Sequence, residues 1–167
     1  LCELINSGRD VTSTITFLVM ASFACFALDD ANRVLIASSG VPEVLVIVCA
    51  NTNEVRVLDF VAETAASLSH NADCRDCMIA AGVAVALIRH YQESSSDTFL
   101  ENTSSTFAAL AHDAGSRQQM VADGVDQALA GACKFSQDST ILALATDALS
   151  RLADSAESRS QMVANGV

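Results

Sequence analysis

The sequence predicts an all-α solenoid built from a unit of 42 residues. The segment SRQQMVADGV, residues 116–125, returns in nearly the same form as SRSQMVANGV, residues 158–167. A Gly-Val pair ends four such segments, always at the same interval. The four glycines are Gly40, Gly82, Gly124 and Gly166. Because a fixed period of a few tens of residues is the signature of repeat proteins, we expect each unit to pack on its neighbours in a row.

The first helix of each unit is expected just before this glycine. In the second complete unit it is CRDCMIAA, residues 74–81, and Gly82 follows, the residue best suited to the left-handed conformation at a helix end. An arginine stands seven residues before each glycine, at Arg33, Arg75, Arg117 and Arg159. A phosphate site is one interpretation of these arginines. A structural role is the better one, in which each side chain covers the neighbouring helix and bonds to carbonyl oxygens at a helix end.

The second and third helices follow in order. The segment VAVALIRHY, residues 83–91, predicts a second helix with Leu87 pointing inward, as do Leu45 and Leu129 in the same phase. The linker QESSSD, residues 92–97, contains good helix-capping residues, so a third helix is expected from about residue 96 to residue 111. Three apolar columns, eight and three residues apart, form one stripe on that helix. These columns are Ile15, Val57, Phe99 and Ile141; Phe23, Ala65, Phe107 and Leu149; and Phe26, Leu68, Leu110 and Leu152.

The phase of the repeat divides the chain. It predicts a partial repeat at 1–31, complete repeats at 32–73, 74–115 and 116–157, and a partial repeat at 158–167. Leu1 is in phase with Glu43 inside a second helix, and Val167 falls where a second helix would begin. Since solenoids need capping repeats to cover their ends, we expect this single solenoid segment to be an excerpt of a longer array.

Composition narrows the possible partners and locations. The formal net charge is −11 and Lys134 is the only lysine, which argues against nucleic acid as the partner. Six cysteines without the spacing of a secreted scaffold favour an intracellular, cytoplasmic or cytoskeletal protein. The apolar run at residues 15–28 is shorter than the roughly 20 residues of a membrane span, so we interpret it as a buried helix and expect no membrane insertion.

The unit resembles the armadillo repeat. The resemblance rests on the 42-residue period, the arginine and Gly-Val pair around the end of the first helix, the leucine in the second helix, and the ALA or SLS end of the third helix. It covers the whole chain. The related HEAT repeat has two helices and usually a proline and an aspartate in phase, which this chain lacks. The resemblance implies a right-handed superhelix with third helices lining a concave groove, and a binding surface in place of an active site.

The resemblance also indicates which residues line this groove. In importin and catenin members of the family, an asparagine column near the end of the third helix holds a peptide backbone. The matching column here is Cys25, Ser67, Ala109 and Arg151, and the family's tryptophan column is replaced by Ala21, Glu63, Ser105 and Asp147. One turn earlier stand Phe17, Asp59, Glu101 and Ala143. We therefore expect an acidic ladder of Asp59, Glu63, Glu101 and Asp147, interrupted by Ser67, Ser105 and Arg151; the alternative is that each carboxylate is simply solvated.

Other chemistry finds little support in the sequence. His70, Cys74 and Cys77 contain a CxxC spacing, but a structural zinc site needs four ligands and no second pair completes the set. His112 and Asp113 are adjacent on one helix and do not face each other. We find no phosphate loop, nucleophile motif or paired catalytic carboxylates, so we expect no enzymatic activity, metal or cofactor.

Two functions fit these observations. The leading hypothesis is a non-enzymatic interaction scaffold, or adaptor, that presents an acidic groove to a basic or helical segment of a protein partner within a larger complex. The alternative is a structural subunit of a cytoskeletal or ciliary assembly, such as an axoneme, which touches its neighbours along its edges. The occupant of the groove distinguishes the two hypotheses. Another chain in the groove favours the scaffold, whereas edge contacts with an empty groove favour the structural subunit.

Overall fold

Residues 11–167 form a row of helices from α2 to α12, without strands in this described part of the chain. The structure is a computed structural model and describes these residues; the expectation for Leu1 lies outside them. The first helices are α3 (Asp30–Ser38), α6 (Ala72–Ala81), α9 (Ala114–Ala122) and α12 (Ala156–Ala164). The second helices are α4 (Val41–Asn51), α7 (Val83–Tyr91) and α10 (Val125–Phe135). The third helices are α2 (Val11–Ala27), α5 (Val55–Ser69), α8 (Asp97–Leu110) and α11 (Ser139–Leu152).

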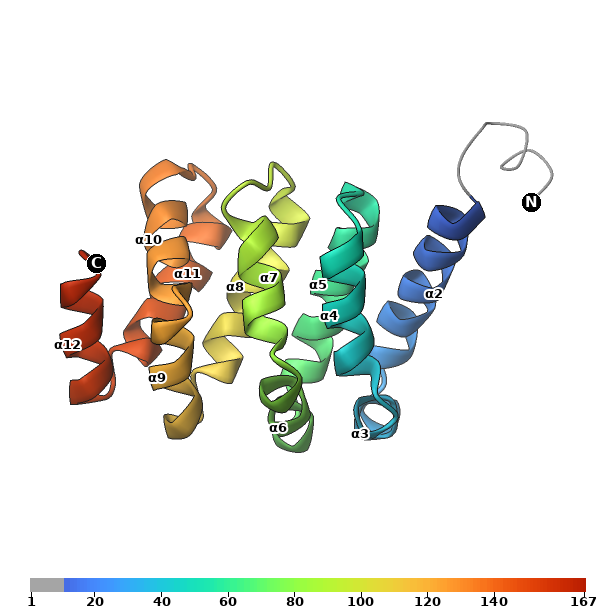
Figure 1. The fold of residues 1–167 in the computed structure, drawn as a ribbon, viewed down its shortest axis with the longest axis horizontal. Helices are drawn as coiled ribbons and strands as arrows, with labels where there is room; N and C mark the ends of the chain where they lie inside the picture. Colours follow the sequence, from blue (N-terminus) through green and yellow to red (C-terminus); the bar gives the residue numbers. More distant parts are fainter. Residues whose placement is uncertain (1–10) are drawn as a thin grey trace.

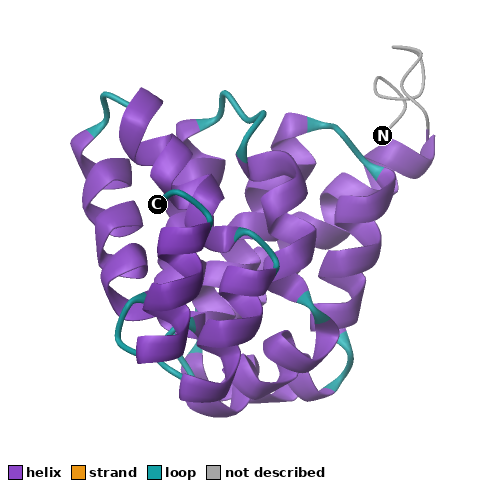
Figure 2. Ribbon diagram, turned by 60° about the vertical axis from the view of Figure 1, so that its left-hand side comes forward, coloured by secondary structure: helices purple, strands orange, loops and turns teal. Residues whose placement is uncertain are grey.

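The units stand side by side along the molecule. Figure 1 shows α4, α7 and α10 in one layer in front of α5, α8 and α11, with the first helices along the lower edge. The third helices form a continuous layer because α2, α5, α8 and α11 each pack on the next. The loops that join second to third helices lie together on the upper edge (Figures 1 and 2). The three-helix interpretation of the unit is therefore confirmed.

Glycines and capping residues set the helix ends at the expected places. Gly40, Gly82, Gly124 and Gly166 all adopt positive φ, between 77° and 89°. This left-handed conformation is costly for residues with a Cβ, which explains why glycine recurs in this phase. Residues with a side-chain oxygen cap every first helix by accepting backbone N–H groups. These caps are Asp29, Asn71, Asp113 and Ser155.

The predicted apolar columns form the core of the inner units. The second-helix leucines Leu45, Leu87 and Leu129 are buried. Two of the third-helix columns are also buried in α5, α8 and α11: Val57, Phe99 and Ile141, and Leu68, Leu110 and Leu152. The exceptions are Ile15 and Phe26 of α2, each 56% exposed. Among the described residues, α2 has no first and second helix of its own unit packed against it, so the same column faces solvent there.

The four in-phase arginines bind backbone carbonyl oxygens, which confirms the structural interpretation. Each guanidinium donates to a small residue at the end of the preceding third helix: Arg33 to Ala27 at 2.7 Å, Arg75 to Ser69 at 2.9 Å, Arg117 to Ala111 at 2.6 Å and Arg159 to Ala153 at 2.6 Å. These carbonyl oxygens lie at the negative end of the helix dipole, where a cation is stabilising. The arginine thus joins one unit to the next.

No single helix in residues 11–167 is both long and apolar enough to cross a membrane. The pair α3 and α4 meets the length and composition test only when taken together, and it is bent by 72°.

Candidate functional site

The candidate site is the surface of α2, α5, α8 and α11 that faces away from the second helices, here called the third-helix face. The stripe of apolar columns directs one side of each third helix into the core, which leaves the opposite side for contact with a partner. The seven predicted site residues lie on α5, α8 and α11. The structure gives these residues different surroundings, and only some of them are available to bind.

Glu63 and Glu101 are the available carboxylates. Glu63 lies on α5 and Glu101 lies one turn earlier in phase on the adjacent α8. Both side chains are half-buried, and among residues 11–167 neither one pairs with a cation or accepts a hydrogen bond. Because these charges are partly removed from water yet unpaired, a cation supplied by a ligand would find less screening here than at an exposed carboxylate.

Asp59 has a partner within the protein. The hydroxyl of Ser96, which caps the start of α8, donates a hydrogen bond of 2.6 Å to the Asp59 carboxylate. Asp59 thereby links α5 to the cap of the next third helix. Its surroundings lie toward the upper edge, where it lines a small pocket with Asn53 and His90. The structure therefore does not bring Asp59 together with Glu63 and Glu101 as a free member of one ladder.

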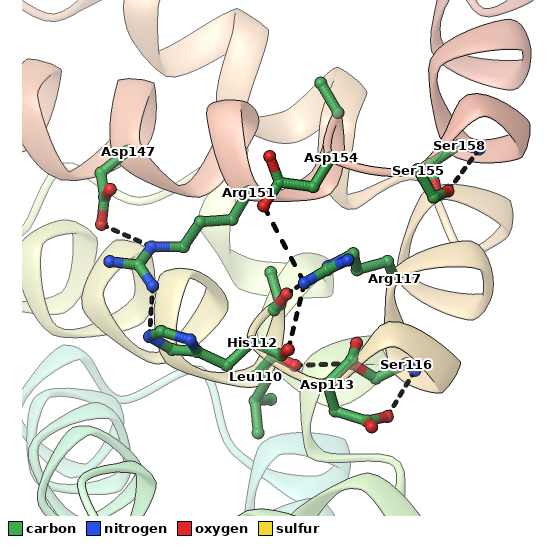
Figure 3. Close-up of polar contacts among 12 residues, drawn as sticks. Leu110, His112, Asp113, Ser116, Arg117, Asp147, Arg151, Asp154, Ser155 and Ser158 are labelled. Carbon is green, nitrogen blue, oxygen red and sulfur yellow. Dashed lines mark hydrogen bonds and ion pairs between the residues drawn. The ribbon is translucent and has the colours of Figure 1, made fainter.

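At the other end of the predicted ladder, Asp147 is neutralised by Arg151. Arg151 Nε donates to Asp147 at 2.9 Å, one turn away on α11, and the same guanidinium contacts the His112 ring at the end of α8 (Figure 3). Sequence phase placed Asp147 and Arg151 one turn apart but did not anticipate His112 as the neighbour. This end of the third-helix face therefore carries a paired charge.

The two predicted serines differ in access. Ser67 is only 9% exposed and is enclosed by the packing of α5, whereas Ser105 is half-buried on α8. Of the two, Ser105 has the hydroxyl that a ligand can reach. It lies on the same helix as Glu101, four residues further along, and thus on the same side.

Aromatic residues gather where α2 meets α5. The rings of Phe17 and Phe60 pack edge to face with centroids 5.3 Å apart, and the guanidinium of Arg56 lies 4.6 Å from the centre of the Phe17 ring. The sequence placed Phe17 in a groove column but did not single out Phe60 or Arg56. The third-helix face is consequently aromatic and cationic where α2 meets the start of α5, acidic further along α5 and on α8, and internally paired at α11.

The thiols of the predicted CxxC spacing and the nearby histidine differ in their surroundings. Cys74 is buried while His70 is exposed, and no group of three or more His, Cys, Asp or Glu residues in the described part of the chain is placed to hold a metal ion. Burial raises the pKa of the Cys49 thiol to about 12, and it also raises the pKa of Cys74. Both are therefore unreactive core residues in the folded protein.

His112 and Asp113 do not form a catalytic pair. The carboxylate of Asp113 caps α9 by accepting the backbone N–H of Ser116 at 2.8 Å, whereas the ring of His112 contacts Arg151 (Figure 3). The two side chains thus serve different neighbours, as expected for adjacent residues near a helix end.

A larger pocket lies away from the third-helix face, on the upper edge. It has a volume of about 770 Å³ and opens between the loop that follows α7 and the loop that follows α10. Tyr91, Leu100, Ala132 and Phe135 are among its lining residues. We call it the rim pocket. The repeat pattern does not predict this pocket, although the sequence carries one signal of it: where α7 has Arg89 and His90, α10 has Gly131 and Ala132 in the same phase.

Solved structures with the same architecture include designed armadillo repeat proteins. A designed armadillo repeat protein in complex with the peptide (KR)4 matches with a TM-score of 0.80 at 15% identity, covering 98% of this chain and 68% of that one. A second designed armadillo repeat protein matches with a TM-score of 0.75 at 19% identity, covering 86% of this chain and 60% of that one. An engineered protein matches with a TM-score of 0.77 at 17% identity, covering 88% of this chain and 61% of that one.

These matches define the fold class. The chain has an armadillo-like repeat fold, and the predicted all-α solenoid is confirmed. Protein-binding scaffolds are common in this class, and one of the matched proteins holds a peptide. The chain spans about 60% of the length of two of these structures, the engineered protein and the second designed armadillo repeat protein. No protein-family model matches the sequence, and no curated protein does.

Proposed function

We propose that the protein is a non-enzymatic scaffold that binds a basic segment of a partner protein on its third-helix face. The observation that carries this proposal is the pair of half-buried carboxylates, Glu63 and Glu101, which have no cationic partner among residues 11–167. They lie on adjacent packed helices, so one bound segment can contact both. Phe17 and Phe60 offer an apolar surface at the α2 end of the same face.

The charge of the chain and the matched structures support a basic ligand. The net charge of −11 attracts a cationic segment and speeds its encounter. The matched designed armadillo protein is bound to (KR)4, a peptide of alternating lysine and arginine. This chain lacks the family's asparagine column, having Cys25, Ser67, Ala109 and Arg151 there. Binding through carboxylates therefore replaces a backbone clamp as the main source of affinity.

The experiment is isothermal titration calorimetry with the peptide (KR)4 as the probe. We expect Glu63→Gln/Glu101→Gln to weaken binding about ten-fold, because each half-buried ion pair contributes about 0.5–1 kcal/mol. Binding of the unsubstituted chain should also weaken as salt rises from 50 to 200 mM, since part of the attraction is screened.

A matched control separates a local site from net charge. Glu43→Gln/Asp76→Asn removes the same two charges from exposed positions on α4 and α6, outside the third-helix face. We expect this control to change affinity less than two-fold. An equal loss of affinity in both double variants would show that the peptide binds through the net charge of the protein and not at a local site. The absence of any binding at 50 mM salt would refute a basic ligand.

A second function, as a structural subunit, is favoured by apolar side chains on the opposite helices. Leu35, Ile47, Val85 and Phe135 are all at least half exposed on α3, α4, α7 and α10. Such residues suit contacts with neighbours in a cytoskeletal or ciliary assembly. Ile47→Ser/Val85→Ser would then remove the chain from its native assembly in sedimentation experiments, whereas Glu63→Gln/Glu101→Gln would not.

For either function we place the protein inside the cell, in the cytoplasm or on the cytoskeleton, as part of a larger complex. The support is the free state of the buried thiols of Cys49 and Cys74, which suits a reducing compartment.

A further inference from the structure

The rim pocket lies where two side chains that bridge the preceding junction between units are missing; the equivalent pocket at that junction, lined by His90, is smaller, about 170 Å³. Between α4 and α7, the ring of His90 contacts the carbonyl oxygen of Cys49 at 2.8 Å, and the Arg89 guanidinium lies 3.5 Å from the carbonyl oxygen of Ala50. These carbonyl groups belong to the last turn of α4, where no further helical N–H is available to them. Arg89 and His90 thus cap the end of α4 from the next second helix.

One unit later the same positions of the second helix carry almost no side chain. Gly131 and Ala132 of α10 are in phase with Arg89 and His90, and Tyr91 and Gln92 at the end of α7 are in phase with Cys49 and Ala50. All four residues line the rim pocket. Among residues 11–167, no side chain donates a hydrogen bond to the carbonyl oxygen of Tyr91 or Gln92. The space left by the missing side chains is open, because a Cβ built on Gly131 meets nothing within 4 Å.

The electrostatics of the pocket favour a cation. The end of α7 contributes the negative end of a helix dipole. Asp97 and Asp138 line the pocket from the starts of α8 and α11, and no Lys, Arg or His is among the lining residues. Asp97 is exposed and has no partner within residues 11–167, while Asp138 caps α11 through one oxygen. Lys134 lies outside the lining, 5.4 Å from the centre of the Phe135 ring.

The side chains that line the pocket favour a planar cation on an apolar stem. Leu100, Ala128 and Phe135 provide apolar walls, and Phe135 is 78% exposed at the surface. A guanidinium can stack on an aromatic ring and donate to two carbonyl oxygens at once, whereas an ammonium acts as a point charge. The geometry of the preceding junction already shows a guanidinium and an imidazole at the equivalent place.

We propose that the rim pocket binds an arginine side chain of a partner protein, which donates to the free carbonyl oxygens at the end of α7 as Arg89 and His90 do within the chain at the end of α4. This site is separate from the third-helix face and does not depend on the function proposed for that face. It would fix a partner on the edge of the solenoid, where the loops between second and third helices lie (Figure 1).

The test uses the 167-residue chain and three blocked tripeptides as probes: acetyl-Leu-Arg-Leu amide and its lysine and citrulline counterparts. Citrulline keeps the shape of arginine but lacks its charge. In ¹⁵N-resolved NMR spectra we expect the arginine peptide to shift the amide signals of Tyr91, Gln92, Gly131 and Ala132. We expect citrulline to bind at least about ten-fold more weakly, because charge-assisted hydrogen bonds are lost.

Variants of the pocket supply the controls. Gly131→Arg/Ala132→His rebuilds the pair found in α7 and should abolish the shifts by filling the pocket from within, whereas Gly131→Ala should leave them in place. Asp97 is exposed, so Asp97→Asn should leave the fold intact. This variant should weaken binding of the arginine peptide about two-fold or more, because one carboxylate at the pocket is lost.

Three results would overturn the proposal. Equal binding of the arginine and citrulline peptides would mean that the guanidinium is not recognised. Shifts confined to the third-helix face and lost in Glu63→Gln/Glu101→Gln would assign the peptide to that other site. Unchanged spectra at millimolar arginine peptide would mean that the pocket does not take this side chain. The double variant Glu63→Gln/Glu101→Gln should leave rim-pocket binding unaltered, so the two proposals can fail separately.

Discussion

Replacing Arg117 tests whether the repeated arginine joins the units. Arg117 donates through Nε to the carbonyl oxygen of Ala111 at 2.6 Å and through Nη2 to that of His112 at 3.1 Å. Its side chain is 17% exposed, and its ion pair with Asp154 is long, at 3.9 Å (Figure 3). Methionine keeps most of the apolar stem but neither donor. We expect Arg117→Met to lower the free energy of unfolding by about 2 kcal/mol, since hydrogen bonds from charged groups contribute about 1.5–3 kcal/mol each and water can reach part of this site.

The assay is urea unfolding followed by circular dichroism, with thermal unfolding as a second measure. A loss of about 2 kcal/mol corresponds to a fall in Tm of about 4–8 °C for a chain of this size. Arg56→Met is the matched control, because Arg56 is exposed and, within residues 11–167, its guanidinium contacts only the Phe17 ring, at 4.6 Å. We expect the control to cost less than about 1 kcal/mol. Equal costs for the two variants would refute the role assigned to Arg117.

Three further predictions concern single positions. Gly124→Ala should cost about 1–2 kcal/mol in urea unfolding, because φ there is 88°; no measurable cost would contradict the left-handed helix end. Iodoacetamide at pH 8 should label exposed Cys25 and spare buried Cys49, as read by mass spectrometry. Folding raises the pKa of Cys49 from 9.0 to about 12, so the free energy of unfolding should fall as the pH rises between these values. Tyr91→Phe should cost about 1–2 kcal/mol, since the buried Tyr91 and Ser104 hydroxyls share a hydrogen bond of 2.6 Å; an unchanged midpoint would contradict this.

The fold could be predicted from the sequence because each unit repeats its own structural rules. A glycine at positive φ, an arginine on the carbonyl groups of the preceding helix and a leucine inside the second helix are each needed once per unit. Strict spacing therefore reveals them without any knowledge of the three-dimensional arrangement. The exposed state of Ile15 and Phe26 departs from the pattern because a column position is buried only where neighbouring helices cover it.

The candidate site was less predictable because its residues differ from unit to unit. Phase placed Asp59, Glu101 and Asp147 on the third helices, but it could not show that the Ser96 hydroxyl binds Asp59 or that Arg151 neutralises Asp147. Those contacts depend on side-chain lengths and on residues from neighbouring units. Glu63 and Glu101 are the predicted carboxylates that remain free in the described part of the chain.

The rim pocket shows what a position-by-position comparison of units can reveal. The column that reads Arg89 in one unit and Gly131 in the next carries no motif that sequence patterns alone would mark as a binding site. Only the structure shows that Arg89 reaches the end of α4 and that the space beside Gly131 is open. In a repeat protein, a missing structural side chain can thus be the signal for a ligand.

The most direct test of the binding function is to find where a basic partner contacts the protein. A carboxylate-reactive crosslinker applied to the complex with the peptide (KR)4, followed by mass spectrometry, maps the bound peptide onto individual acidic residues. We predict crosslinks at Glu63 and Glu101 on the third-helix face. Crosslinks confined to Glu43 and Asp76, on α4 and α6, would contradict the assignment of this face as the binding surface.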